Sequence, residues 1–315
     1  MNRSLFRSVA VAAFATAIGL AGITAPAAGA SASGGRIAFG SARYGHTNNI
    51  FTMNTDGSGV RQLTFTREQD GADLRQQWSP DGTKLVYEHR NTSTSRRQLW
   101  VMNADGSNQH RLLHDPEFLD FYPSYSPDGT RVVFGRCRKD FGACALYSID
   151  SHGNDLTAIT HFDVAHEVLD NAPKYSPDGE KIAFSSYNRD GVPASVYTIS
   201  ATGGPVTRLT PAALSGADPD WSPDGSRVAF WSNCCVPGRP AIWTIGADGN
   251  NAVKLTHPGS LRFDFSPDYS PDGSKIAYEW DLDDGTSNVA TINTDGSDRT
   301  LIQRDAFLPV WQPTG

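Results

Sequence analysis

A five-residue motif, an aromatic residue followed by Ser-Pro-Asp-Gly, constrains the fold of this chain more than any other feature. Its five copies begin at Trp78, Tyr125, Tyr175, Trp221 and Tyr269, and an altered sixth copy begins at Trp311. Successive copies begin 42 to 50 residues apart, which is typical of repeat architectures. In each copy the Pro restricts φ, the Asp can bond to nearby backbone and the Gly accepts a positive φ, so the motif predicts a tight turn.

The segments between the motifs have the pattern of short strands. In the first full repeat, an apolar triplet at residues 85–87 follows the turn, and a second strand at residues 99–102 precedes an Asp-Gly turn. Six residues after that Gly comes Leu112, and the same spacing recurs in every repeat, as expected for hairpins of fixed register. Four short strands in each unit of this length predict a β-propeller.

The phase of the repeats at the two chain ends predicts how the propeller closes. The first unit begins with its second strand at residues 37–39, and the chain ends with a first strand at residues 308–313. We therefore predict an all-β fold in residues 33–315, a six-bladed β-propeller of four-stranded antiparallel blades. Its first blade is shared between residues 36–64 and 307–313, because pairing of the N- and C-terminal strands protects otherwise open edges.

Residues 1–32 have the pattern of a secretory signal peptide. Arg3 and Arg7 precede an apolar run from Val9 to Ile23, and small residues around Ala30 suit cleavage. A membrane anchor is the alternative, although the run is Ala-rich and short for a span. We therefore expect an exported protein, secreted or in the cell envelope, with no membrane span after signal removal.

The charge balance narrows the class of partner. The chain has 27 Lys and Arg residues against 34 Asp and Glu residues, a formal net charge of −7. This balance argues against nucleic acid, because phosphate contacts need Lys and Arg. We expect a monomer that binds a protein or a peptide.

The four Cys residues are compatible with disulfides in an exported protein. Cys137 and Cys144 flank a short loop and can be joined across it. Cys234 and Cys235 are adjacent, so a bond between them would form a strained ring. Pairing between the two sites would join loops two repeats apart, and thiols that stay reduced or bind a metal are a further alternative.

A repeated Asp is the main candidate for a site. It precedes the aromatic residue by five positions in four repeats, as Asp73, Asp120, Asp170 and Asp264. We place these carboxylates, with His166, at the mouth of the central channel on the side of the long loops. No cofactor is predicted, unless the four Asp residues hold Ca²⁺ or another divalent cation or bind a basic partner. The alternative, which the repetition favours, is that each Asp bonds within its own loop.

The same loop-rich side carries a second, basic pattern. Arg96 and Arg97 lie in one repeat, and Arg136, Arg138 and Lys139 lie in the next. These residues can meet an acidic ligand, and a solvated rim is the alternative.

The succession of motif, apolar triplet, second strand and Asp-Gly turn resembles the WD40-like β-propeller repeats of the TolB C-terminal domain. The resemblance covers nearly all of residues 36–313 and implies a TolB-like six-bladed propeller with a role in an envelope complex. It does not extend to the N-terminal α/β domain of TolB, or to the hydrolase domain that accompanies similar propellers, so it implies nothing about their activities.

The remaining motifs give no sign of catalysis. The sequence has no Gly-x-Ser-x-Gly, no Ser-x-x-Lys and no phosphate-binding Gly loop. We therefore predict a non-catalytic binding or scaffold protein that recognises a protein, peptide or envelope ligand on its loop-rich face. The alternative is a metal-assisted lyase or hydrolase that acts on a polysaccharide in the channel.

Overall fold

A computed structural model describes residues 35–45, 47–139, 142–192, 194–234, 239–259 and 262–314. The chain divides into two units, Met1–Ser33 and Gly34–Gly315. The predicted signal peptide, residues 1–32, lies outside the described residues. The described part of the second unit is all-β, apart from one short 3₁₀ turn, η1 (Arg189–Gly191).

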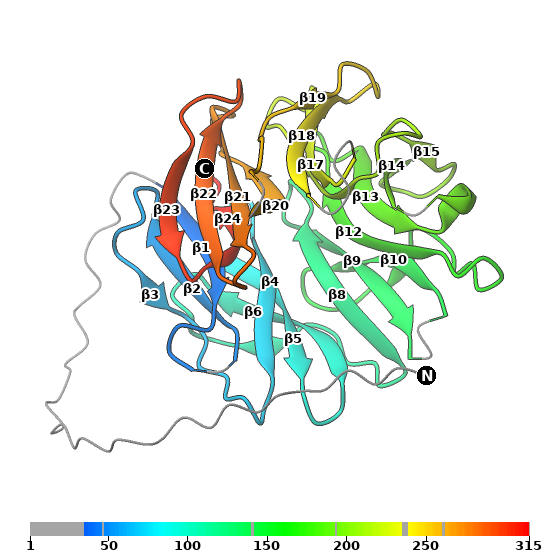
Figure 1. Cartoon of the computed structure of the whole chain (residues 1–315). Helices are drawn as coiled ribbons and strands as arrows, with labels where there is room; N and C mark the ends of the chain where they lie inside the picture. The colour runs from blue at the N-terminus through cyan, green and yellow to red at the C-terminus, as the bar shows by residue number, and fades with distance from the viewer. Residues whose placement is uncertain are drawn as a thin grey trace, which may run out of the picture. The chain divides into compact units, whose positions relative to one another are not determined.

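Four of the sheets have four strands each (Figure 1). The first contains β24 (Phe307–Trp311), β1 (Arg36–Ser41), β2 (Asn49–Asn54) and β3 (Arg61–Gln62). The second contains β4 (Ala72–Trp78), β5 (Lys84–Asn91), β6 (Arg96–Asn103) and β7 (His110–Arg111). The third contains β16 (Ala217–Trp221), β17 (Arg227–Ser232), β18 (Ala241–Gly246) and β19 (Val253–Lys254). The fourth contains β20 (Arg262–Tyr269), β21 (Lys275–Leu282), β22 (Ser287–Asn293) and β23 (Thr300–Arg304).

The fifth sheet has eight strands, which departs from the prediction of six separate four-stranded blades. Its strands are β8 (Phe118–Tyr125), β9 (Arg131–Arg138), β10 (Cys144–Asp150), β11 (Thr157–Ala158), β12 (Leu169–Tyr175), β13 (Lys181–Tyr187), β14 (Ser195–Ser200) and β15 (Thr207–Arg208). Two four-strand sets are joined where Cys144 pairs in parallel with Leu169, and the Cys144 N–H donates to the Val168 carbonyl at 2.9 Å. The two-residue β11 pairs with Tyr147 and Ser148, so the start of β10 keeps an open edge at which this pairing can form.

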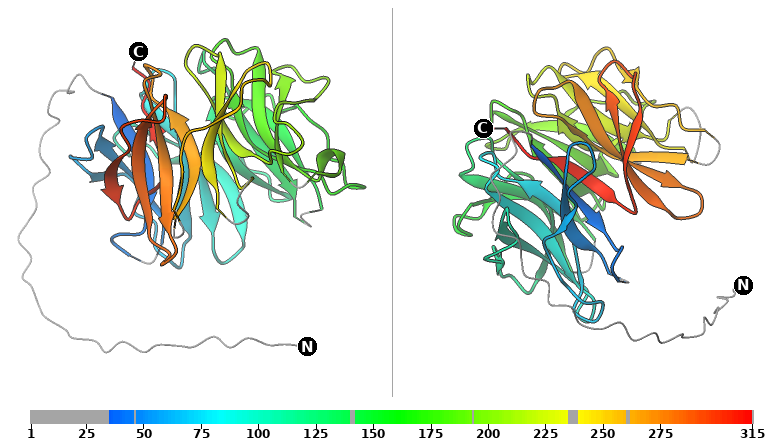
Figure 2. Two further views of the ribbon diagram at one scale, coloured as in Figure 1. Left: turned by 45° about the horizontal axis from the view of Figure 1, so that its top comes forward. Right: turned by 90° about the vertical axis from the view of Figure 1, so that its left-hand side faces the viewer.

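The two ends of the described chain share one sheet. Strand β24 pairs antiparallel with β1, with Ile37 opposite Trp311 and Ala38 opposite Val310. The innermost strands β4, β8, β12, β16, β20 and β24 each contact the next, and β24 contacts β4. The sheets of this unit therefore stand side by side around a common centre, as in a β-propeller (Figure 2).

The Ser-Pro-Asp-Gly motif forms its turn through local hydrogen bonds. The Gly82 N–H donates to the Ser79 carbonyl at 2.8 Å, and Gly82 has a φ of 66°. The Ser79 hydroxyl donates to Asp81 at 2.6 Å and accepts the Lys84 N–H at 2.9 Å. These contacts recur in the other four intact copies, so the motif specifies a hairpin that joins the innermost strand to the second strand.

The hydrophobic core lies between neighbouring sheets. Trp78 of β4 packs with Tyr87 of its own sheet and with Ala38 and Val310 of the preceding one. The apolar triplet on each second strand is fully buried, as Ile37, Ala38 and Phe39 illustrate at 0% exposure. Burial of an apolar side chain of this size stabilises the fold by about 1.5–3 kcal/mol, so the sheets are held together mainly by these layers.

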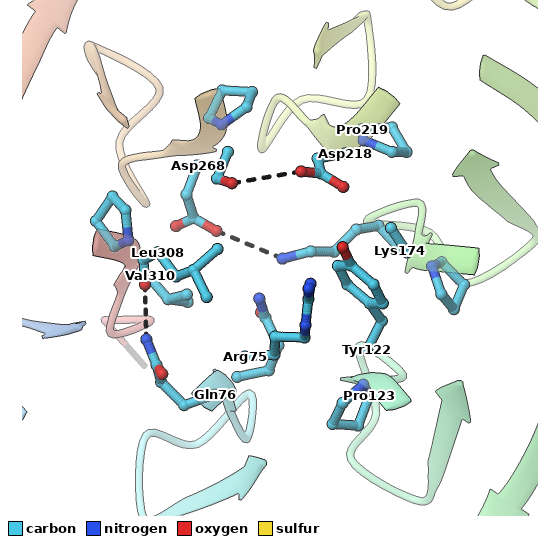
Figure 3. Close-up of a pocket in the computed structure, with 16 residues that line it drawn as sticks. Arg75, Gln76, Tyr122, Pro123, Lys174, Asp218, Pro219, Asp268, Leu308 and Val310 are labelled. Carbon is cyan, nitrogen blue, oxygen red and sulfur yellow. Dashed lines mark hydrogen bonds and ion pairs between the residues drawn. The ribbon is translucent and has the colours of Figure 1, made fainter. Parts of the chain in front are cut away.

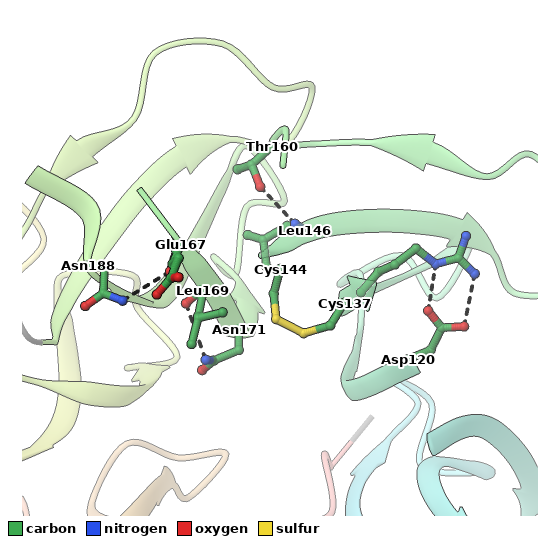
Figure 4. Close-up of a disulfide and its surroundings, with 10 residues drawn as sticks. Asp120, Cys137, Cys144, Leu146, Thr160, Glu167, Leu169, Asn171 and Asn188 are labelled. Carbon is green, nitrogen blue, oxygen red and sulfur yellow. Dashed lines mark hydrogen bonds and ion pairs between the residues drawn. A yellow bond between two sulfur atoms is a disulfide. The ribbon is translucent and has the colours of Figure 1, made fainter. Parts of the chain in front are cut away.

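A disulfide joins Cys137 on β9 to Cys144 on β10, as predicted (Figure 4). The two residues face each other in the antiparallel pairing of these strands, and both are buried. The bond closes the loop between β9 and β10 at the edge where the eight-stranded sheet is joined. The candidate bond between Cys234 and Cys235 lies outside the described residues, because Cys235 is not among them.

Candidate functional site

The antiparallel strand order gives each sheet two different ends. The Pro-Asp-Gly and Asp-Gly turns fall at one end, which we call the turn end, and the longer connections fall at the other, the loop end. In the sheet of β4 to β7, for example, Gly82 and Gly106 lie at the turn end and the hairpin at Thr94 lies at the loop end. Each innermost strand therefore runs from the loop end to the turn end.

Two of the four predicted Asp residues are held by side chains of their own sheet or of the loop that leads into it. Asp73 accepts a hydrogen bond from the Thr66 hydroxyl at 2.5 Å and contacts His89 Nδ1 at 2.7 Å. Asp120 accepts two hydrogen bonds from Arg136, one from Nε at 2.7 Å and one from a terminal nitrogen at 3.0 Å (Figure 4). Burial raises the pKa of Asp120, although the Arg136 guanidinium opposes this effect.

The other two are held in the same way. Asp170 accepts hydrogen bonds from Thr160, Ser186 and Arg189 at 2.8, 2.6 and 2.7 Å. Asp264 accepts one from Arg299 at 3.1 Å. Burial raises the pKa of both carboxyl groups.

The structure does not bring the five predicted site residues together. The partners of each Asp come from its own set of strands and adjoining loops, and His166 is exposed, with its ring 2.9 Å from Asp163. Among the described residues, no group of three or more His, Cys, Asp or Glu side chains could hold a metal ion. The geometry therefore matches the structural interpretation of the repeated Asp more closely than a shared cation site.

A feature that was not predicted from the sequence shapes the channel, a β-bulge in each innermost strand. In β4 the pairing register shifts between Leu74 and Gln77, and equivalent shifts occur at the other five strands. At each bulge a non-Gly residue has a φ between 47° and 57°; these residues are Arg75, Tyr122, Ala172, Asp218, Ser266 and Leu308. All six line a cavity on the axis (Figure 3).

A signal for these residues was present in the sequence. A Pro stands two positions before the aromatic residue in five repeats, so the residue before that Pro marks the bulge. The pattern was missed because Pro restricts φ and removes a donor without indicating which way the preceding side chain points. Only the pairing register shows that the side chain before it faces the axis.

The axial cavity is small, and its mainly apolar lining of prolines and aliphatic side chains includes a few charged groups. It encloses about 70 Å³ of water-accessible space, enough for about five water molecules. Arg75 lies with its guanidinium 3.6 Å from the centre of the Tyr122 ring. Across the cavity, Asp218 accepts hydrogen bonds from Trp231 Nε1 at 3.0 Å and from the Ser266 hydroxyl at 3.3 Å.

Lys174 joins two buried carboxylates on the turn side of this cavity. Its Nζ atom lies 3.5 Å from Asp268 (Figure 3) and 3.5 Å from Asp220. Asp220 accepts the Tyr269 N–H and Asp268 accepts the Trp311 N–H, each at 2.8 Å. Burial and the nearby Asp220 charge raise the pKa of Asp268 to about 7, although Lys174 opposes the rise. These three side chains therefore tie neighbouring innermost strands together.

A second acidic pair lies on β21. Burial and the charge of Asp281 raise the pKa of Glu279 to about 8, and Glu279 accepts the Leu308 N–H at 3.2 Å.

Beyond Lys174, the channel widens at the turn end into a vestibule of about 240 Å³, whose wall contains all six motif aromatics. Four of these aromatics are less than 10% exposed, so they serve mainly as packing between sheets.

The comparisons with known proteins agree with this architecture. A family model described as the TolB beta propeller domain matches residues 23–167 and 162–315. Comparison with curated proteins finds no match. Within the described residues, no helix is long and apolar enough to cross a membrane.

Several solved structures share the fold. TolB from Acinetobacter baumannii is 24% identical with a TM-score of 0.74, over 89% of this chain and 67% of that chain. The putative TolB from Agrobacterium tumefaciens is 21% identical with a TM-score of 0.67, over 89% and 99%. An oligogalacturonate lyase in complex with manganese is 18% identical with a TM-score of 0.59, over 85% and 74%. At these identities the likeness shows the fold alone. Because the two family-model matches together span nearly all of the chain, this protein belongs to the TolB beta propeller domain family.

Proposed function

We propose that this protein is an exported, non-catalytic binding propeller that holds a protein or peptide partner at the loop end of its axial channel. The observation that carries the proposal is the size of the axial cavity. Its volume of about 70 Å³ is far below the roughly 300 Å³ at which small-molecule sites begin. A partner that rests on the surface and inserts one side chain fits this space, whereas a sugar chain does not.

The chemistry of the channel supports binding rather than catalysis. Asp218, Asp220 and Asp268 each accept a hydrogen bond from a backbone N–H or an indole N–H of a neighbouring element. These bonds hold neighbouring strands together around the channel, which keeps the wall rigid, as a binding surface requires.

We infer that the unit has six blades and is a closed ring, with the eight-stranded sheet counting as two blades. The support is that six innermost strands contact one another in sequence and that β24 pairs with β1. A closed ring keeps the loop ends in a constant arrangement, which a binding surface needs.

Export is the second part of the proposal. The pattern of residues 1–32 predicts a signal peptide, and the Cys137–Cys144 disulfide suits an oxidising compartment. A location in the cell envelope or outside the cell accommodates both observations. A monomeric state is retained as part of the same proposal.

The alternative, a metal-assisted lyase or hydrolase acting on a polysaccharide, has less support. Such chemistry needs a cation held by several side chains next to the substrate. Asp73, Asp120, Asp170 and Asp264 are each bonded to protein donors and do not converge. A divalent cation on any of them remains a hypothesis for the metal experiment described in the Discussion.

Site-specific photo-crosslinking tests the proposed surface. A benzophenone amino acid is placed at Thr94, exposed in the loop-end hairpin of the sheet of β4 to β7, and separately at His110, exposed near its turn end. Crosslinking in cells of the source organism should give a discrete product from position 94 and none from position 110. A product only from position 110, or from neither position, would contradict the proposal.

A further inference from the structure

Three arginine side chains converge on one buried glutamate at the loop end, beside the channel. The shortest contacts to the Glu88 carboxylate are 3.1 Å from Arg75, 3.5 Å from Arg90 and 3.7 Å from Arg97. The Glu88 side chain is 0% exposed, whereas those of Arg90 and Arg97 are 40% and 28% exposed. We call these four residues the arginine cluster.

The arginine cluster carries more positive charge than its own acid can balance. Among the described residues, Glu88 is the sole acid within ion-pair distance of Arg90 and Arg97. Arg90 and Arg97 lie directly opposite each other in the pairing of β5 with β6, where like charges destabilise a sheet. Burial lowers the pKa of Arg97, and the Arg90 and Arg75 cations add to the effect, which Glu88 opposes.

Two buried donors of the cluster form no aligned hydrogen bond. Within the part of the chain that the structure describes, the buried Nε atoms of Arg75 and Arg90 have no hydrogen-bond partner. The two Glu88 oxygens are close to the guanidinium groups but not aligned for hydrogen bonds with them. A guanidinium group carries five N–H donors, and one carboxylate can accept about four hydrogen bonds, so three arginines on one glutamate leave most donors free for another anion.

The surroundings hold these side chains in place. The Arg75 guanidinium lies 3.6 Å from the centre of the Tyr122 ring (Figure 3). The Arg97 guanidinium lies 5.3 Å from the centre of the Phe121 ring. The two aromatic residues belong to β8 of the neighbouring sheet. Stacking on aromatic rings orients arginine side chains and lowers the entropy that they lose when they bind a ligand. Across the channel, Asp218 is the acid that faces Arg75 and balances part of its charge.

We propose that the arginine cluster binds carboxylates of an acidic segment of the partner protein. This inference rests on the proposed function, because it places the segment at the loop end of the channel. Arg75 contacts one Glu88 oxygen, and Arg90 and Arg97 contact the other, so the free donors lie on two sides of Glu88. Two separate sets of donors match successive acidic side chains along a peptide better than one compact phosphate.

Peptide titration tests the inference. An N-acetylated, C-amidated hexaglutamate peptide is titrated into the protein without residues 1–32 at low salt and followed by calorimetry. The same titration uses the Arg90→Gln/Arg97→Gln variant and the Arg96→Gln variant. Arg96 is the matched control, because it lies on the same strand and precedes Arg97, so its side chain points to the other face of the sheet.

We expect hexaglutamate to bind the unmodified protein about tenfold or more tightly than the Arg90→Gln/Arg97→Gln variant. The Arg96→Gln variant should bind within about twofold of the unmodified protein, since it keeps the cluster intact. Equal losses in both variants would overturn the inference and indicate general charge attraction. Preferential binding of inorganic phosphate or of capped hexalysine would also overturn it.

The inference and the proposed function fail in different ways. A crosslinked partner at position 94 with no hexaglutamate binding would contradict the acidic-segment inference and still support the proposed surface. Hexaglutamate binding that depends on Arg90 and Arg97, without any crosslinked partner, would sustain the cluster as an anion site and contradict the proposed function.

Discussion

Replacement of Asp268 by Asn should remove a defined part of the pH dependence of stability. Asp268 is buried in the channel wall, 3.5 Å from Lys174, and accepts the Trp311 N–H at 2.8 Å. Asn has nearly the same shape and can still accept that N–H through its carbonyl oxygen. The substitution therefore removes a titrating group with little change in packing.

The magnitude follows from the shift in pKa. Burial and the Asp220 charge raise the pKa of Asp268 from 3.8 to about 7, so between these values the folded protein keeps a proton that the unfolded chain has lost. The free energy of unfolding must then fall as the pH rises through this window. A shift of about three pH units, at about 1.4 kcal/mol per unit, amounts to about 4 kcal/mol.

The assay is urea unfolding of both proteins between pH 4 and pH 8. The Asp268→Asn variant should lose about 4 kcal/mol less stability over this range than the unmodified protein, because Glu279 and the other acids titrate in both. Asp272→Asn is the control. Its carboxylate is exposed in the turn, and hydrogen bonding to Ser270 lowers its pKa, away from the pH range of the assay. Parallel pH profiles for the unmodified protein and Asp268→Asn would refute the reasoning.

Three further predictions concern the disulfide, a buried ion pair and metal binding. The Cys137→Ala/Cys144→Ala variant should unfold about 4 °C below the unmodified protein in a thermal scan, because a bond across a sequence separation of 7 contributes about 2.5 kcal/mol. An unchanged midpoint would contradict this. Arg136→Leu should lower the free energy of unfolding in urea by about 3–5 kcal/mol, since it leaves the Asp120 carboxylate buried without a partner, and adding Asp120→Leu should recover part of the loss. EDTA should leave the thermal midpoint unchanged, because the four predicted Asp residues already have protein donors; a fall that Ca²⁺ restores would revive the cation hypothesis.

The repeats are the part of the fold that local sequence could predict. Ser79, Asp81 and Gly82 form their turn through contacts within five residues, so the motif alone specifies the hairpin. The register of the following strands then follows from the burial of their apolar side chains. For the same reason the Cys137–Cys144 disulfide, which crosses one hairpin, could be predicted from the sequence.

The site could not be predicted in the same way. The repeated Asp looked like a candidate because it recurs, yet the partners of Asp170 come from Thr160, Ser186 and Arg189, which lie 10, 16 and 19 residues from it. Whether a carboxylate is free or bonded depends on such contacts, which no spacing rule describes. In the structure each of these carboxylates contacts protein donors, and the spacing of the repeats does not describe those contacts.

The sequence by itself determined the class of fold, since a turn motif at a regular spacing needs only local chemistry and burial to build strands. Tertiary structure alone decided the rest. The join between β10 and β12, the axial cavity at the bulges, and the convergence of Arg75, Arg90 and Arg97 on Glu88 all depend on side chains whose orientation is set by pairing register and by the neighbouring sheet. The sequence shows which residues are charged or polar, but packing decides which of them come into contact.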